Sequence, residues 1–157
     1  MGFWTMAESE KVILTNMCMV YDSNKVLVQD RLDKKWKGLT FPGGHVEKHE
    51  SFTDAVIREV REETGLTIFC PKLCGIKQWS HSEDVRYIVL FYKTDKFAGE
   101  LKSSSEGDVF WMELEEFKKA ELAKDMSDML EVFLDDDKSE FYYYHNKTDG
   151  EWKYEIK

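Results

Sequence analysis

The chain has 157 residues, of which 42% are hydrophobic and 14% aromatic, enough to build the core of one domain. Its formal net charge of −9 argues against a nucleic acid polymer as partner, because contacts to a phosphate backbone need a basic surface. No stretch approaches the roughly 20 apolar residues of a membrane span. We expect one domain over residues 1–157, a monomer or homodimer, with neither nucleic acid polymers nor membranes as partners.

The cysteine count and the N-terminal stretch point to a cytoplasmic protein. Cys18, Cys70 and Cys74 are an odd number, so they cannot all pair with one another. Residues 1–11 lack the basic start and long apolar run of a secretory signal. The Cys70–Cys74 pair has no second pair or nearby histidines for a zinc site, so we expect structural thiols in a reducing compartment.

The first half of the chain predicts two strands and a helix. β-Branched and apolar residues predict strands at 11–21 and 25–31. A basic loop punctuated by glycine follows. A helix is predicted at 52–64, because Ser51 is a good N-cap and Gly65 a natural C-terminal stop.

The second half of the chain predicts more strands than helices. Strands are expected at 66–70, 73–80, 85–95 and 108–114. A second helix is expected within 115–137. Alternation around a turn at 146–150 predicts a hairpin over 139–157. The fold class is α/β, with a mixed sheet, a core over about 10–135 and a C-terminal hairpin.

The predicted helix places carboxylates in line with apolar residues. Phe52, Val56, Glu59 and Glu63 are spaced four, three and four apart, so they lie along one stripe. Glu62 falls beside the stripe. Like charges at this spacing destabilise a helix, and the helix dipole disfavours anions near the C-terminal end. A solvated charged face therefore explains the pattern poorly.

Such crowded carboxylates need a cation. Arg58 and Arg61 are expected to point away from the stripe and to offset its charge only in part. A divalent metal is the better candidate, because hard oxygen ligands that converge on one spot suit Mg²⁺ or Mn²⁺.

The same stretch resembles the Nudix box. Gly44, Glu50 and the segment 58–66 match its nine defined positions over 23 residues. The resemblance covers most of residues 10–135 and implies an α/β/α sandwich. It also implies metal-dependent hydrolysis of a nucleoside diphosphate linked to another group. The details look most like the MutT-type nucleoside triphosphate pyrophosphohydrolases of bacteria.

The resemblance also implies roles for individual residues. Glu59, Glu62 and Glu63 become Mg²⁺ ligands, with the carbonyl of Gly43 as a further ligand. The alternative for these acids is ordinary surface ion pairing.

Two further roles concern the ion pair of the box and the catalytic base. Glu50 is expected to pair with Arg58 and to hold the glycine loop against the helix. Glu106 lies on a loop where family members often carry another metal-binding or basic carboxylate, although it is equally an ordinary loop acid. Either Glu59 or Glu106 is the candidate acceptor of a proton from water.

Candidate substrate contacts lie outside the box. Arg31 and Lys35 belong to a basic loop that precedes it and can lie over phosphates, although solvated loop charges are the alternative. Trp36, Trp79 and Trp111 are candidates to stack on a base, or else core residues. The tyrosines at 142–144 are expected to pack within a strand.

Asp125 is the candidate residue for recognising the base of a nucleotide. In MutT-like folds the residue that contacts the N7 edge of the base lies near the start of the second helix, and Asp125 occupies that position here. An ionised carboxylate only accepts hydrogen bonds, so it would favour the N7–H of an oxidised guanine over the lone pair of guanine. The alternative is an acid that merely begins a helix.

Three readings of function remain open. The first is a (d)NTP pyrophosphohydrolase that releases a nucleoside monophosphate and pyrophosphate, with 8-oxo-dGTP as a candidate substrate. The second is a pyrophosphatase of ADP-ribose or another nucleotide sugar, although such enzymes often carry extra N-terminal strands and about ten residues precede the first strand here. The third is a non-catalytic nucleotide sensor, a class that usually loses box carboxylates, whereas all are present here.

Overall fold

The computed structural model describes residues 8–157. The elements are β1 (Lys11–Asp22), β2 (Lys25–Arg31), β3 (Gly38–Thr40), α1 (Phe52–Thr64), β4 (Thr67–Ile68), β5 (Lys72–Ser82), β6 (Val85–Thr94), β7 (Phe97–Ala98), β8 (Gly107–Glu113), α2 (Leu114–Phe117), α3 (Met126–Leu134), β9 (Glu140–His145) and β10 (Trp152–Ile156). Most of the stretch considered for a secretory signal lies outside the described residues. Within them, no helix is long and apolar enough to cross a membrane.

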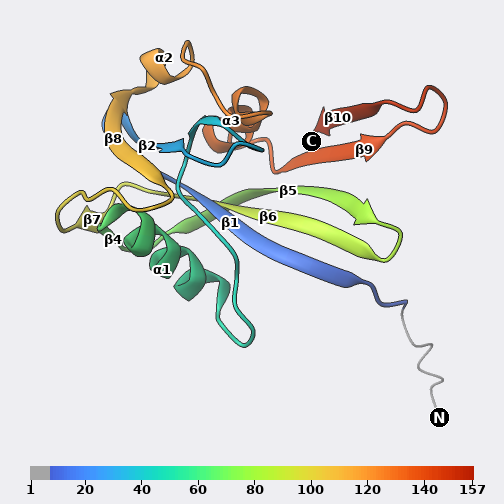
Figure 1. Ribbon diagram of the computed structural model, residues 1–157, viewed down its shortest axis with the longest axis horizontal. Helices are drawn as coiled ribbons and strands as arrows, with labels where there is room; N and C mark the ends of the chain where they lie inside the picture. Colours follow the sequence, from blue (N-terminus) through green and yellow to red (C-terminus); the bar gives the residue numbers. More distant parts are fainter. Residues whose placement is uncertain (1–7) are drawn as a thin grey trace.

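Most strands join one mixed sheet, as expected (Figure 1). Its order is β10-β9-β5-β6-β1-β2-β3, and β8 also pairs with β2. β1 runs parallel to β6 and β5 runs parallel to β9, whereas the other neighbours are antiparallel. β4 and β7 form a separate small pair.

Both faces of the sheet are covered, which explains why β1 reads as a continuous apolar run. Met17 and Met19 face a core that includes residues of α3. Cys18 and Val20, whose side chains point to the opposite face, belong to a second core with residues of α1. Figure 1 shows α1 and α3 on opposite sides of β1, so the predicted α/β/α sandwich is confirmed.

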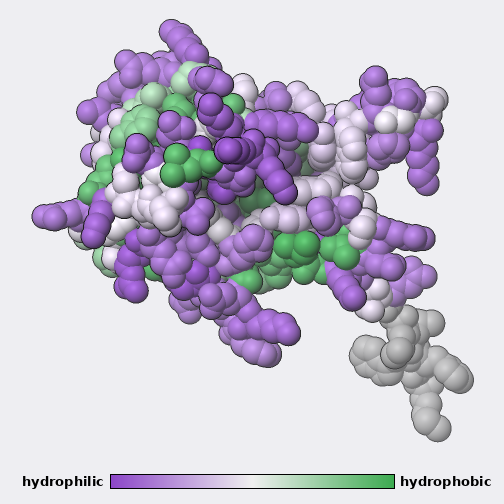
Figure 2. Space-filling model, in the orientation of Figure 1, coloured by the Kyte–Doolittle hydropathy of each residue, from purple (hydrophilic) through white to green (hydrophobic). Residues whose placement is uncertain are grey.

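Helix α1 has the predicted bounds because its caps are local. The side chain of Ser51 accepts a hydrogen bond of 3.0 Å from the backbone N–H of Asp54. At the other end, Gly65 adopts φ 78°, and its N–H donates to the carbonyl of Arg61. Hydrophilic side chains cover the outer face of the helix (Figure 2).

The second helix expected within 115–137 is present as α3, and the short helix α2 precedes it. The four-residue α2 and the nine-residue α3 are separated by residues 118–125. In this segment the carbonyl of Glu121 accepts from the N–H of Leu39, and the N–H of Ala123 donates to the carbonyl of Leu39. Pairing with β3 thus uses backbone groups that a continuous helix would need.

The C-terminal hairpin is present and extends the sheet. β9 and β10 pair antiparallel, and β9 lies beside β5 over Ile76–Gln78. The ring of Tyr143 in β9 stacks on Trp152 in β10 with centroids 4.9 Å apart. The hairpin therefore brings an aromatic surface next to β5.

Candidate active site

The glycine loop lies directly against β1. The N–H of Asn16 donates to the carbonyl of Gly44 at 2.8 Å, and the N–H of Cys18 donates to the carbonyl of Pro42 at 2.9 Å. A Cβ atom at Gly43 would lie 2.1 Å from the carbonyl oxygen of Asn16. Only glycine allows the loop to approach the strand this closely.

Glu63 anchors this loop to α1 from a buried position. One carboxylate oxygen accepts hydrogen bonds from the N–H of Gly43 at 3.0 Å and from Nε2 of Gln29 at 3.3 Å. The residue is only 5% exposed. Burial, against the opposing hydrogen bond from Gly43, raises the pKa of Glu63 from 4.5 to about 7, and the charge of Glu59 adds to the rise.

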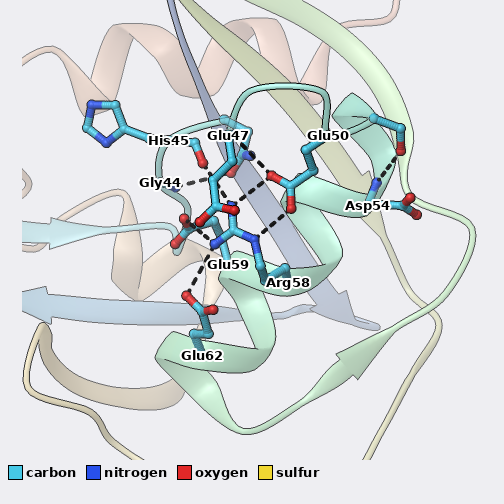
Figure 3. Close-up of polar contacts among 10 residues, drawn as sticks. Gly44, His45, Glu47, Glu50, Asp54, Arg58, Glu59 and Glu62 are labelled. Atoms are coloured by element: carbon cyan, nitrogen blue, oxygen red, sulfur yellow. Dashed lines mark hydrogen bonds and ion pairs between the residues drawn. The ribbon is translucent and has the colours of Figure 1, made fainter.

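Arg58 connects the acids of α1 to the loop (Figure 3). Its guanidinium donates to both oxygens of Glu50, at 2.7 and 2.9 Å, and to the carbonyl of His45 at 3.0 Å. The expected Glu50–Arg58 pairing is therefore present. The same group also donates to Glu59 at 2.8 Å and Glu62 at 3.3 Å.

The expectation that Arg58 points away from the carboxylate stripe is thus wrong. Its long side chain spans the space between neighbouring turns, so the direction of its Cα–Cβ bond does not limit where the guanidinium lies. The hydrogen bond from Arg58 lowers the pKa of Glu50 to about 2. The pKa of Glu59 is raised nonetheless, because burial outweighs the contact with Arg58.

The carboxylates share a site but are not closed around a common point. Among residues 8–157, no three His, Cys, Asp or Glu side chains are arranged to hold a metal ion. Glu59 and Glu62 instead both accept from Arg58. The donors themselves are hard oxygens, the type that Mg²⁺ and Mn²⁺ bind.

A cavity of about 870 Å³ runs from these acids to a group of aromatic residues. Its lining includes Gly43, Glu59, Glu62, Glu63, Glu106, Arg31, Trp36, Trp79, Asp125, Lys77, Tyr87 and Tyr143. Segments far apart in the sequence thus meet in one cavity that is acidic in one part and aromatic in another.

Two candidates lie elsewhere. Lys35 is exposed and outside the cavity lining, in a turn where its backbone N–H donates to Asp33. Trp111 packs on Phe97, with ring centroids 5.0 Å apart, beside the core under α1. Strand β8 directs Trp111 to that face of the sheet, away from the cavity. Neither Lys35 nor Trp111 therefore lines the cavity.

The sequence interpretation missed Lys77 and Tyr143. Lys77 donates to Asp125 at 3.0 Å, and Tyr143 lines the cavity although its neighbours Tyr142 and Tyr144 stack on each other. Lys77 lies two residues before Trp79 on a strand, so both share one face. That alternation was the available signal for Lys77.

Two polar groups of the lining are left without partners in the described part of the chain. The side-chain Nδ2 of Asn16 and Nε of Arg31 are buried and make no hydrogen bond. Buried polar groups are normally bonded, so both are available to an acceptor in the cavity.

Comparison with known proteins identifies the family. Residues 13–133 match the model of the NUDIX domain. The chain belongs to the Nudix hydrolase family. The general reaction of this family is hydrolysis of a pyrophosphate bond.

Individual Nudix relatives differ in what their names record. An uncharacterised Nudix hydrolase of Bacillus subtilis, YvcI, is 29% identical over 123 residues, which are 74% of this chain and 76% of the relative. An ADP-ribose pyrophosphatase of Methanocaldococcus jannaschii is 35% identical over 91 residues, 56% of this chain and 53% of the relative. The structure of a MutT mutator protein from Bacillus halodurans has a TM-score of 0.74 at 25% identity, covering 92% of this chain and 97% of that one.

Proposed function

We propose that this Nudix hydrolase cleaves nucleoside triphosphates to a nucleoside monophosphate and pyrophosphate, with Mg²⁺ or Mn²⁺ as cofactor. The observation that carries the proposal is a single cavity with acids in one part and aromatic rings in another. A nucleotide has the matching polarity, with phosphates at one end and a stacking base at the other. We place the reaction in the cytoplasm, where the three free thiols are stable.

The residues at the acidic part fit a hard divalent cation. Glu59, Glu62 and Glu63 carry like charges in one site, and the carbonyl of Gly43 is the further proposed ligand. Glu62 has a side chain that is 58% exposed, so it can leave Arg58 and turn to an ion. A bound Mg²⁺ ion neutralises phosphate oxygens and acidifies water.

The remaining chemistry belongs to side chains of the cavity. Glu59 or Glu106 accepts the proton of the attacking water, and burial of Glu59 makes its carboxylate more basic. Arg31, whose Nε has no hydrogen-bond partner within residues 8–157, donates to a phosphate oxygen. Arg58, paired with Glu50, positions Glu59 without touching substrate.

Two relatives support different substrates. The similarity to a MutT mutator protein along nearly the whole chain favours triphosphates, and we include 8-oxo-dGTP with Asp125 as its reader. The relative named as an ADP-ribose pyrophosphatase supports ADP-ribose as a second candidate.

A substrate panel tests the proposal. The full chain is incubated with Mg²⁺ and each of the four dNTPs, the four NTPs, 8-oxo-dGTP and ADP-ribose, and initial rates are compared at several concentrations. We expect the highest kcat/KM for a triphosphate. A higher kcat/KM for ADP-ribose would move the assignment to the second candidate, and no turnover of any compound would refute hydrolysis of nucleotides.

A further inference from the structure

Lys77 is a buried cation for which the proposed reaction gives no role. It lies on β5, between β6 and β9, and only 8% of the residue is exposed. Lysine is almost never fully buried without a partner. Its partner is Asp125, 48 residues away, whose Oδ2 accepts from Nζ at 3.0 Å.

The carboxylate of Asp125 pairs with Lys77 and does not cap the helix that it precedes. Asp125 occupies the N-cap position of α3 with φ 65°, yet its side chain makes no capping hydrogen bond. A carboxylate at that position ordinarily accepts from the first turn. The acid is therefore directed to Lys77, and the ion pair joins the sheet to α3 within the cavity lining.

Aromatic rings surround the ammonium group. Its Nζ lies 5.4 Å from the ring centre of Trp79, 5.1 Å from Phe141 and 5.7 Å from Tyr143. These contacts stabilise a cation in a poorly hydrated place. Phe141 and Tyr143 belong to β9, which lies beyond the matched domain of residues 13–133. The terminal hairpin therefore supplies two of the three rings around Lys77.

The ammonium retains donors for a ligand. It carries three N–H donors, and within residues 8–157 Asp125 is its only hydrogen-bond acceptor. A ligand group that reaches Lys77 must fit among the rings of Trp79, Phe141 and Tyr143, and the flat base of a nucleotide fits there better than a phosphate.

We propose that Lys77 is a specificity-determining residue that donates to a ring carbonyl oxygen of the base, so that keto purines bind better than adenine. Trp79 and Tyr143 also line the cavity, but contact with aromatic side chains does not discriminate among bases, because every base has an aromatic face. Hypoxanthine and guanine present an oxygen at C6, whereas adenine presents an amino group there, a donor that cannot accept from an ammonium. The proposal rests on the proposed function only in placing a nucleotide in this cavity.

The test compares inosine monophosphate with AMP, which have nearly the same shape and differ at C6 and N1. Their dissociation constants are measured by calorimetry with the full chain in Mg²⁺, for the parent, Lys77→Met and Lys72→Met. Lys72 is the matched control, because it is an exposed lysine of the same strand outside the cavity. We expect the parent to bind inosine monophosphate roughly 10-fold or more tightly than AMP. Lys77→Met should bring the ratio close to one, and Lys72→Met should keep it.

Each other outcome overturns the proposal. A parent ratio near one refutes it without any variant, even if Lys77→Met fails to fold. An unchanged ratio in Lys77→Met, or an equal loss of both ligands with a lowered Tm, means that the ion pair is structural. Hydrolysis of ITP and ATP is measured separately. If both are cleaved but the two monophosphates bind equally, the proposed function is supported and the role of Lys77 is refuted. If inosine monophosphate binds more tightly but neither triphosphate is cleaved, the role of Lys77 is supported and the proposed function is refuted.

Discussion

A Cβ atom added to Gly44 would lie 2.3 Å from the carboxylate carbon of Glu59. The glycine thus leaves the space that this carboxylate occupies beside Arg58. The same loop approaches β1 at Gly43, where the nearest atom is a backbone oxygen. Gly44 therefore leaves space for the side chain of Glu59, whereas Gly43 allows a close contact with the backbone of Asn16.

We predict that Gly44→Ala and Gly43→Ala separate activity from stability. The first variant displaces the Glu59 carboxylate, so kcat/KM should fall by about 100-fold while Tm changes little. The second must move the loop away from Asn16, so it should lower Tm markedly as well. Steady-state kinetics and thermal melts of both variants check this. Parent-like kcat/KM in Gly44→Ala would show that the position of Glu59 is unimportant.

Loss of a charged ligand should nearly abolish turnover. Glu62→Gln and Glu63→Gln remove a negative charge that the proposed cation requires, and we expect rates lower by orders of magnitude with the fold retained. Glu131→Gln, an exposed acid of α3 outside the cavity, is the control. Circular dichroism reports the fold and initial rates report the chemistry. Full activity of either variant, or of the parent in excess EDTA, would exclude the metal.

Asp125 should contribute to selection of the oxidised base. Its carboxylate accepts from N7–H of 8-oxoguanine and repels the lone pair at N7 of guanine. We expect the parent to prefer 8-oxo-dGTP over dGTP roughly 10- to 100-fold in kcat/KM, and Asp125→Ala to lose most of that preference. An absent preference in the parent argues against a sanitising role. If Asp125→Ala keeps the preference for 8-oxo-dGTP, Asp125 does not select the base, and Trp36 and Trp79 become the candidates.

Binding of inosine monophosphate should weaken at alkaline pH. Burial lowers the pKa of Lys77 below 10.5, partly opposed by Asp125 and assisted by the charge of Lys124, while Tyr143 of β9 faces the same ammonium. The charge-assisted hydrogen bond is present below this lowered pKa and is lost as pH rises through it. Lys77→Arg keeps its charge and should remove this dependence. Calorimetric titrations between pH 7 and about 10 measure it, and a parent affinity constant over that range would contradict the role of the charge.

Local patterns made α1 and its caps predictable from the sequence. Ser51, Gly65 and the helical spacing of the acids act within a few residues of one another, and the structure reproduces the predicted bounds. The C-terminal hairpin was predictable for the same reason, because its turn at 146–150 and the alternation beside it are local.

Long-range pairing and the conformation of one side chain produced the features that the sequence did not reveal. The break between α2 and α3 depends on Leu39, more than 80 residues earlier in the chain. The ion pair of Lys77 with Asp125 depends on where α3 docks on β5. The direction of the Arg58 guanidinium is a choice among side-chain conformations, which helical periodicity does not determine.

The products formed from one nucleoside triphosphate in ¹⁸O-labelled water test the central claim most directly. The reaction is run with the full chain and Mg²⁺, and ³¹P NMR identifies each product and the phosphorus atom that carries the label. We predict nucleoside monophosphate and pyrophosphate in equal amounts, with ¹⁸O in one of these two products and no orthophosphate. A nucleoside diphosphate together with ¹⁸O-labelled orthophosphate would contradict the proposed pyrophosphohydrolase.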